Sequence, residues 1–382
     1  MDFALSEEQE QLQSQARELL ARECPTARVR KIMASESGHD ADLLRAFAEA
    51  GWLGVLVPEE LGGSGLGLLD AAVLLGELGR AVAPGPFLVS SIGAVVALRE
   101  GGTKAQQKAW LPRIAAGGAV ATLALAEPPE PRFDAAGVAA RARAAGAATR
   151  LDGTKLFVEY AQLADLVLVA ARSGRAGRGA HSQGWQGVEL FQLPAGTPGV
   201  ELERLVSVDE TRRPCELRLA GARLPAGARL PRGSKALQRA LDACAVAIAA
   251  ESLGGSERAL EDAVAYVKVR QQFGRPVGSF QAVQHMAAEA VAAIEPARSL
   301  LWYAAWAFDA RPAEASLAAS MAKAQCSEVY RRVSRTAIEM QGGIGFTWEN
   351  DMHLFYKRAL ANASAFGDVE QHQDRVADLA GL

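Results

Sequence analysis

The residues that could move a proton lie close together near the C-terminus. Asp368, Glu370 and His372 follow a run of small residues and the pair Phe366 and Gly367. A carboxylate or imidazole on a short polar stretch against an apolar wall is suited to general-base catalysis. Asp368 is also a good N-cap for a final helix. The residues alone therefore leave two interpretations open, an active-site base and a helix cap.

A second candidate site is the stretch YVKVRQQFGRPVGSFQAVQH at residues 266–285. It predicts a helix that ends at Arg270, a left-handed Gly274 and a following helix with Ser279 as its N-cap. A turn between two antiparallel helices explains the Gly, Pro and Ser. It does not explain why two glutamines and an arginine crowd the corner, where an arginine can hold a phosphate. A plain turn and an anion site are both open.

A third candidate is the glycine cluster Gly342, Gly343 and Gly345 in the stretch EMQGGIGFTWEN. Glycine lets the backbone approach a ligand or another helix closely, but ordinary turns need it too. No strand precedes the cluster, so a dinucleotide-binding fingerprint is not supported. The chain also lacks the G-x-S-x-G, HExxH and Walker motifs and a Cys/His nucleophile arrangement, which disfavours hydrolases and NTPases.

The hydrophobic pattern that must position these residues changes twice along the chain. The first third is helical, beginning with a capping box from Ser6 to Gln9. Short, partly alternating runs follow, with a long hairpin loop predicted at residues 172–187. Long Ala-rich helices then return and suit an antiparallel bundle. The predicted fold is α+β and multi-domain: an N-terminal helical domain (1–118), a middle small β domain (119–230) and a C-terminal four-helix bundle (231–382).

Composition excludes several classes of protein. The 382 residues are 49% hydrophobic and 22% charged, with a net charge of −3, which predicts a folded core and no nucleic-acid partner. The apolar stretches are interrupted well short of a membrane span, and the N-terminus lacks the pattern of a signal peptide. The four cysteines are scattered, which predicts free thiols and no metal site. We expect a soluble cytoplasmic protein.

Taken together, several segments resemble the acyl-CoA dehydrogenase family nearly end to end. They are LSEEQEQLQSQARELL, GWLGVLVPEELGGSGLGLLDAAVLLGELG, LDGTKLFVEYAQLADLVLVAAR, YVKVRQQFGRPVGSFQAVQHMAAE and AIEMQGGIGFTWENDMHLFYKRA. The resemblance implies the same three-part fold, an FAD cofactor partly shared across a subunit interface, and a dimer or tetramer. It also implies FAD contacts at Arg270, Gln272, Phe273 and Gln281, at Glu339, Gln341, Gly342 and Gly343, and at Phe157.

The reaction implied by the resemblance is α,β-dehydrogenation of an acyl-CoA thioester. A carboxylate removes the α-proton while flavin accepts the β-hydride, and electron-transferring flavoprotein is the usual acceptor. By motif position, the commonest site of the catalytic Glu is here Phe366. The alternative site is Cys244, and the neighbouring CoA-binding Arg is Ala245. The family's Trp-x-Thr, which stacks on and hydrogen-bonds the flavin, is here Phe157-Val158-Glu159, and the Gln usual at position 339 is Glu.

These departures resemble the less catalytic subunit of bacterial α2β2 heterotetrameric acyl-CoA dehydrogenases, several of which act on steroid side chains or other bulky acyl-CoA thioesters. The leading hypothesis is thus an FAD-dependent subunit that works with a homologous partner. A second is a self-sufficient dehydrogenase or flavin oxidase with Asp368 as its base. Glu251, two helical turns beyond Cys244, is expected instead to make a polar contact inside the bundle. A third is an assembly subunit without flavin or activity.

Overall fold

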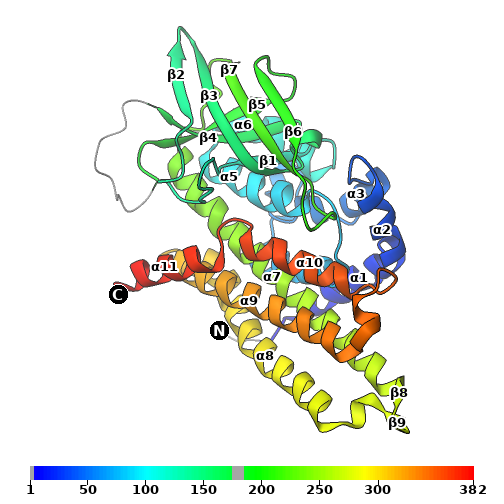
Figure 1. Cartoon of the computed structure of the whole chain (residues 1–382). Coiled ribbons are helices and arrows are strands. Elements are labelled where there is room, and N and C mark those ends of the chain that lie inside the picture. The colour runs from blue at the N-terminus through cyan, green and yellow to red at the C-terminus, as the bar shows by residue number, and fades with distance from the viewer. Residues whose placement is uncertain (1–3, 174–184) are drawn as a thin grey trace. The chain divides into compact units, whose positions relative to one another are not determined.

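The computed structural model describes residues 4–173 and 185–382 (Figure 1). Its α-helices are α1 (Glu7–Glu23), α2 (Thr26–Ala34), α3 (Ala41–Glu49), α4 (Leu68–Arg80), α5 (Val95–Gly101), α6 (Lys104–Ala115), α7 (Gly233–Val269), α8 (Gln281–Ala310), α9 (Ala315–Gln341), α10 (Met352–Ser364) and α11 (Val369–Ala380). Its strands are β1 (Ala121–Ala124), β2 (Arg141–Ala145), β3 (Ala148–Glu159), β4 (Leu166–Ser173), β5 (Val188–Pro194), β6 (Val200–Arg204), β7 (Pro214–Leu224), β8 (Gln271–Gln272) and β9 (Arg275–Pro276).

These elements follow the predicted order of helices, strands and a helical bundle, so the predicted fold class is confirmed. By internal contacts the chain divides into two compact units. One, the helical unit, consists of Met1–Lys31, Leu68–Ala83 and Ala245–Leu382. The other, the sheet unit, consists of Ile32–Gly67 and Pro84–Cys244. The three sequence-based domain boundaries stay a prediction. In the described part of the chain, no helix is long and apolar enough to cross a membrane.

The sheet unit is built on a strand order of β1-β4-β2-β3-β7-β6, with β5 paired to the other side of β4. β4 runs parallel to β1 and β2 and antiparallel to β5. The predicted loop at residues 172–187 joins this last pair, and its residues 174–184 lie outside the described part. β2 (RARAA) and β6 (VELER) are five residues long and rich in charged side chains, so their local sequence gives a weak strand signal; pairing with longer neighbours makes them strands.

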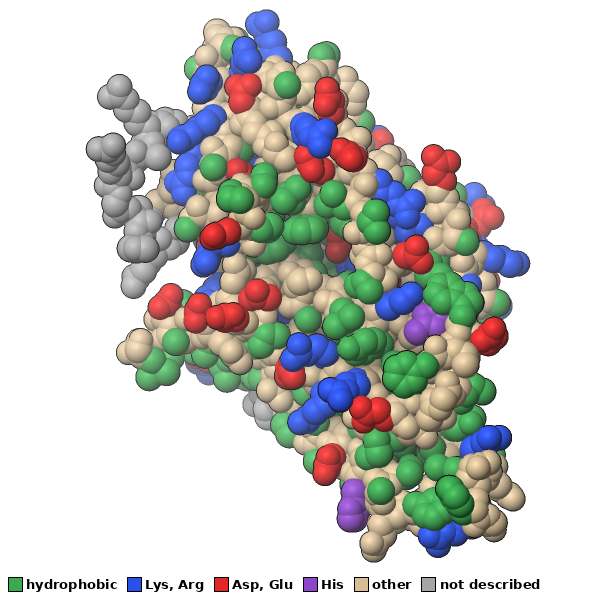
Figure 2. Space-filling view, viewed as in Figure 1, with side chains coloured by type: hydrophobic (Ala, Val, Ile, Leu, Met, Phe, Trp, Pro, Cys, Tyr) green, Lys and Arg blue, Asp and Glu red, His purple; other side chains and the backbone are tan. Residues whose placement is uncertain are grey.

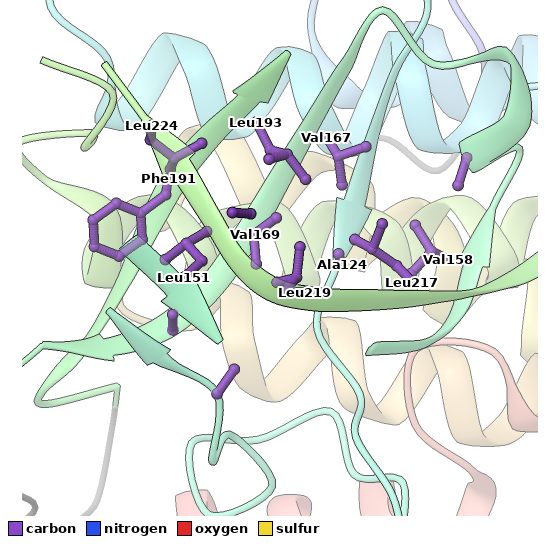
Figure 3. Close-up of a cluster of buried hydrophobic side chains, with 14 of the residues drawn as sticks. Ala124, Leu151, Val158, Val167, Val169, Phe191, Leu193, Leu217, Leu219 and Leu224 are labelled. Carbon is purple, nitrogen blue, oxygen red and sulfur yellow. The ribbon is translucent and has the colours of Figure 1, made fainter. Parts of the chain in front are cut away.

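One face of the sheet holds a cluster of buried aliphatic and aromatic side chains. Figure 3 shows Leu217 and Leu219 of β7 close to Val169 of β4 and Ala124 of β1, all of them buried. Alternate residues of β7 are buried, as expected for a strand with one face toward a core. This core fixes the register of β3, whose last residues include Phe157 and Glu159.

A buried ion pair ties β3 to the segment after β1. Lys155 Nζ donates to Glu127 Oε1 at 2.5 Å and to the carbonyl of Leu125 at 3.1 Å. The Glu127 carboxylate also accepts from the backbone N–H groups of Ala139 and Ala140. Burial lowers the pKa of Lys155 to about 8, although the neighbouring carboxylate opposes the shift. The pair therefore fixes the connection between β1 and β2 against β3.

The helical unit contains two antiparallel long helices, α8 and α9, with α10 and α11 lying along α9 (Figure 1). Its α4 and α7 approach backbone to backbone, since a Cβ on Gly254 would lie 1.9 Å from the carbonyl oxygen of Gly76. At the start of the unit, Ser6 and Gln9 form the predicted capping box on α1. Small residues thus let the helices pack closely enough to bury the polar groups described below.

Replacing Lys155 by Met should lower the free energy of unfolding by about 3–5 kcal/mol, because it leaves Glu127 buried without its counter-charge. Denaturant unfolding followed by circular dichroism measures this loss. In the double variant Lys155→Met, Glu127→Gln, the amide oxygen still accepts from the backbone and no charge is left unpaired. We expect part of the stability to return; an equal or larger loss would contradict the role given to the pair.

Candidate functional site

The turn between α10 and α11 carries the residue that, by motif position in the sequence, is expected at the site of the family's catalytic base. That residue, Phe366, is 9% exposed and has a left-handed backbone with φ of 56°. Gly367 follows at φ of 104°. A phenyl ring cannot accept a proton, so this position supplies no base.

Asp368 begins α11 as its N-cap. Its carboxylate accepts from the backbone N–H of Gln371 at 2.8 Å, and the residue is exposed. The capping interpretation is therefore confirmed in the structure. A role as base stays a prediction, and one carboxylate oxygen of Asp368 is already engaged by the helix end.

The two other positions considered for a base are both closed to proton transfer. Cys244 is fully buried on α7, and burial raises the pKa of its thiol. Glu251 is buried and hydrogen-bonded to the guanidinium of Arg358. Arg358 also donates to the carbonyl of Ala83 at 3.3 Å. Glu251 therefore makes the polar contact inside the helices that the sequence predicted, and is held there as the partner of a buried cation.

The predicted anion site lies on an exposed corner formed by the β8–β9 hairpin and the start of α8. Hydrophobic and basic side chains share the surface at this end of the helical unit (Figure 2). Within the described part of the chain, the guanidinium of Arg270 has no hydrogen bond or ion pair, and Phe273 is 92% exposed. Gln272 and Gln281, which belong to the same predicted site, are also exposed. The corner thus offers an unused cation and a ring to a ligand or partner.

The backbone of this corner differs from its sequence prediction in one respect. Gly274 is left-handed at φ of 76°, as predicted, and α7 ends one residue before Arg270. Ser279 is not the N-cap of the next helix. Its hydroxyl donates to the carbonyl of Pro276 at 2.7 Å, and Phe280 occupies the cap position without a side-chain bond. The ring of Phe280 instead lies under the guanidinium of Arg275, 4.0 Å from ring centroid to Cζ, which shapes the corner.

A second group of predicted FAD contacts lies at the end of α9. Glu339 accepts from Arg335 at 3.0 Å, and the buried amide of Gln341 accepts from Asn350 at 2.5 Å. A Cβ added to Gly342 or Gly343 would meet no atom within 4 Å. The side chains here are engaged within the protein, while the glycine backbone is open to approach by a ligand.

Phe157 belongs to the sheet unit, where an irregularity in the β3–β7 pairing gives it a left-handed φ of 55° and leaves it 48% exposed. Two residues on, the carboxylate of Glu159 accepts from Arg212 Nη1 at 2.8 and 3.0 Å. Both side chains are nearly buried. Arg212 gives no signal in the sequence, because only the fold brings residues 53 positions apart into contact.

These observations test how well the chain suits FAD. A free guanidinium and open glycine backbone fit a diphosphate and its adenosine. At position 159, where the resemblance leads us to expect a hydroxyl donor for the flavin ring, the Glu159 carboxylate accepts from Arg212 and has no proton to donate. The residues present therefore fit the adenosine diphosphate end of FAD and do not fit its ring end. Within residues 4–173 and 185–382, no group of three or more acidic, His or Cys side chains is placed to hold a metal.

Comparison with known proteins gives matches along nearly the whole chain. Residues 6–118 match the acyl-CoA dehydrogenase N-terminal domain and residues 231–380 the C-terminal domain. The acyl-CoA dehydrogenase IpdE2 of Mycobacterium tuberculosis is 33% identical over 94% of this chain and 92% of that protein.

Two solved structures share the fold along their whole length. A variant of the steroid ACAD Tcur3481–Tcur3483 has a TM-score of 0.88 at 34% identity and covers 98% of both chains. A chain of the ChsE4–ChsE5 complex from Mycobacterium tuberculosis has a TM-score of 0.90 at 28% identity, covering 100% of this chain and 99% of that one. The predicted family and fold are confirmed, and the protein belongs to the acyl-CoA dehydrogenase family of oxidoreductases.

Proposed function

We propose that this chain is a subunit of an FAD-dependent acyl-CoA dehydrogenase and that a homologous partner subunit supplies the catalytic base. The observation that carries the proposal is Phe366, a side chain without a proton acceptor in a buried turn, at the position where the motif order leads us to expect the base. The nearby alternatives are committed elsewhere, because Glu251 pairs with Arg358 and Cys244 is a buried thiol. An acyl-CoA oxidation on this chain alone therefore has no obvious proton acceptor besides Asp368.

The contribution of the chain to FAD binding follows from the two exposed groups of the helical unit. Arg270 and Gln272, with Phe273 and Gln281, would hold the diphosphate and adenosine. The open backbone of Gly342 and Gly343 lets the same cofactor approach. Bound flavin supplies a hydride acceptor, which no protein side chain provides.

The residues at the expected position of the flavin ring favour an arrangement in which two subunits share the binding of one FAD. A carboxylate at position 159 cannot donate a hydrogen bond, and moving it would leave Arg212 nearly buried without its partner. We infer that this chain lends its adenosine diphosphate corner to a flavin whose ring lies against the partner. Phe157 would then pack against the partner or its ligand.

Substrate, partner and location are proposed from the relatives. The similar structures include one named as a complex of two different chains and one named as a steroid enzyme. We accordingly propose an α2β2 complex acting on steroid or other bulky acyl-CoA thioesters, with electron-transferring flavoprotein as acceptor. All four cysteines are free and buried, which suits a reducing compartment such as the cytoplasm.

A second candidate function is a self-sufficient dehydrogenase or oxidase with Asp368 as base. The observation in its favour is that the Asp368 carboxylate is exposed and two residues from Phe366. A non-enzymatic assembly subunit is the third candidate.

The visible spectrum of the purified chain distinguishes these candidates. We expect no flavin band near ~450 nm from the chain alone and a clear band when it is co-purified with its partner subunit. A yellow chain that is bleached by an acyl-CoA without any partner would contradict the proposal and support the self-sufficient enzyme. A partner complex that never acquires flavin would support the assembly role.

Asp368→Asn tests the alternative base. Asn is an equally good N-cap, so stability should be unchanged, and turnover by the complex should stay within a factor of about two if Asp368 is only a cap. A general base contributes roughly 10²–10⁴-fold, so a loss of that size in kcat would assign the base to Asp368. Asp368→Ala is the control for capping, with an expected loss of ~0.5–2 kcal/mol in unfolding free energy.

Arg270→Ala tests the diphosphate corner. Losing one charge-assisted hydrogen bond should raise the Kd of the apo-complex for FAD by roughly 10- to 100-fold, as measured by titration calorimetry. Lys268→Ala removes an exposed cation two residues earlier on α7 and serves as the matched control. Equal affinities in the two variants would show that Arg270 does not contact the cofactor.

A further inference from the structure

Two buried side chains hold the turn between α10 and α11 by its backbone carbonyls. Lys323 Nζ, on α9, donates to the carbonyl of Gly367 at 3.0 Å and to that of Ala363 at 3.3 Å. The Nε2 atom of His372, on α11, lies 3.1 Å from the carbonyl oxygen of Phe366. Lys323 is 0% and His372 5% exposed. We call these two residues the carbonyl clamp.

The hydrogen bond that His372 makes fixes the protonation state of its imidazole. A carbonyl oxygen only accepts, so His372 Nε2 carries the hydrogen. Its Nδ1 is buried and has no hydrogen-bond partner among the described residues. A second proton would place an uncompensated charge in the interior near Lys323. Burial first, and the lysine second, lower the pKa of His372 to about 3, so the ring is neutral at physiological pH.

The lysine of the clamp is costly to bury. Its two hydrogen bonds are to carbonyls, and burial lowers its pKa to about 7 while Asp368 opposes the shift. Ala363 belongs to the last turn of α10, where a cation is favoured by the free carbonyls of the helix end. A buried amine whose two hydrogen bonds go to backbone carbonyls stabilises one particular shape of this turn.

That shape is an unusual one for a phenylalanine. A non-glycine residue with positive φ costs roughly 1–2 kcal/mol, so Phe366 keeps its φ of 56° only where its surroundings impose it. Gly367 is needed beside it, since a Cβ there would lie 3.0 Å from His372 Nε2. Two of the three clamped carbonyls are those of residues 366 and 367, on either side of the Gly367 nitrogen, so the clamp sets the direction in which the Phe366 side chain leaves the backbone.

We propose that Lys323 and His372 are positioning residues that lock the side chain at position 366 in one orientation. The lock depends only on the helical unit. Its link to function rests on the proposed function, because by motif position the locked phenyl ring stands where the family's base is expected, and it accepts no proton.

The test places 4-fluorophenylalanine at position 366 of the full chain, in complex with its partner subunit, and records the fluorine NMR spectrum. We expect one resonance in the otherwise unchanged protein. His372→Leu and Lys323→Met should each lose that single resonance, giving several lines or a shift toward free fluorophenylalanine. His372→Gln keeps an N–H donor and should restore the original line, which a general loss of stability would not do. Melting temperatures show which variants are folded.

A spectrum that is the same in His372→Leu and the unchanged protein would overturn the clamp, as would His372→Gln behaving like His372→Leu. If Lys323→Met does not fold, the two His372 variants still decide.

Discussion

The arrangement of the helical unit depends on how one short turn is held. Between α10 and α11 the chain passes through two consecutive residues with positive φ, and the first is a phenylalanine. Such a turn persists only if its carbonyls have strong partners, and here they face a buried lysine and a neutral histidine from two other places in the unit. The turn therefore fixes Phe366, starts α11 at Asp368 and brings α11 along α9. Residue 366 has a defined place whatever its side chain.

Three buried basic side chains, Lys155, Arg358 and Lys323, find their partners in three different ways. Lys155 and Glu127 form an ion pair whose carboxylate also accepts from backbone N–H groups. Glu251 and Arg358 form another, with spare guanidinium hydrogens directed to carbonyls. Lys323 relies on carbonyls alone. An unpaired buried charge costs several kcal/mol. Each of these basic side chains therefore keeps its partners, and the segments that carry those partners are held in one conformation. The carboxylates in these pairs are correspondingly unavailable as bases.

The proposed loss of a base at position 366 is compatible with these constraints. Arg270, Gly342 and Gly343 are exposed, so they take no part in the packing around the turn. Position 366 lies in a packed turn whose clamp contacts backbone carbonyls and not the side chain of that residue. On this proposal, exchanging Glu for Phe changes the chemistry of the site and leaves the backbone as it is, in agreement with the fold shared with the similar structures.

The residues in their order were enough to predict the sequence of helices and strands, the family, the capping box at Ser6 and the absence of a carboxylate at position 366. Each of these depends on local pattern or on motif order. Tertiary structure decided what the sequence could not show: that Glu159 is bound to Arg212, that Glu251 is bound to Arg358, that Phe280 and not Ser279 precedes α8, and that Lys323 and His372 hold one turn. The physical reason is the same in each case. A buried polar group must find a partner, and which partner it finds depends on how segments distant in the chain pack together.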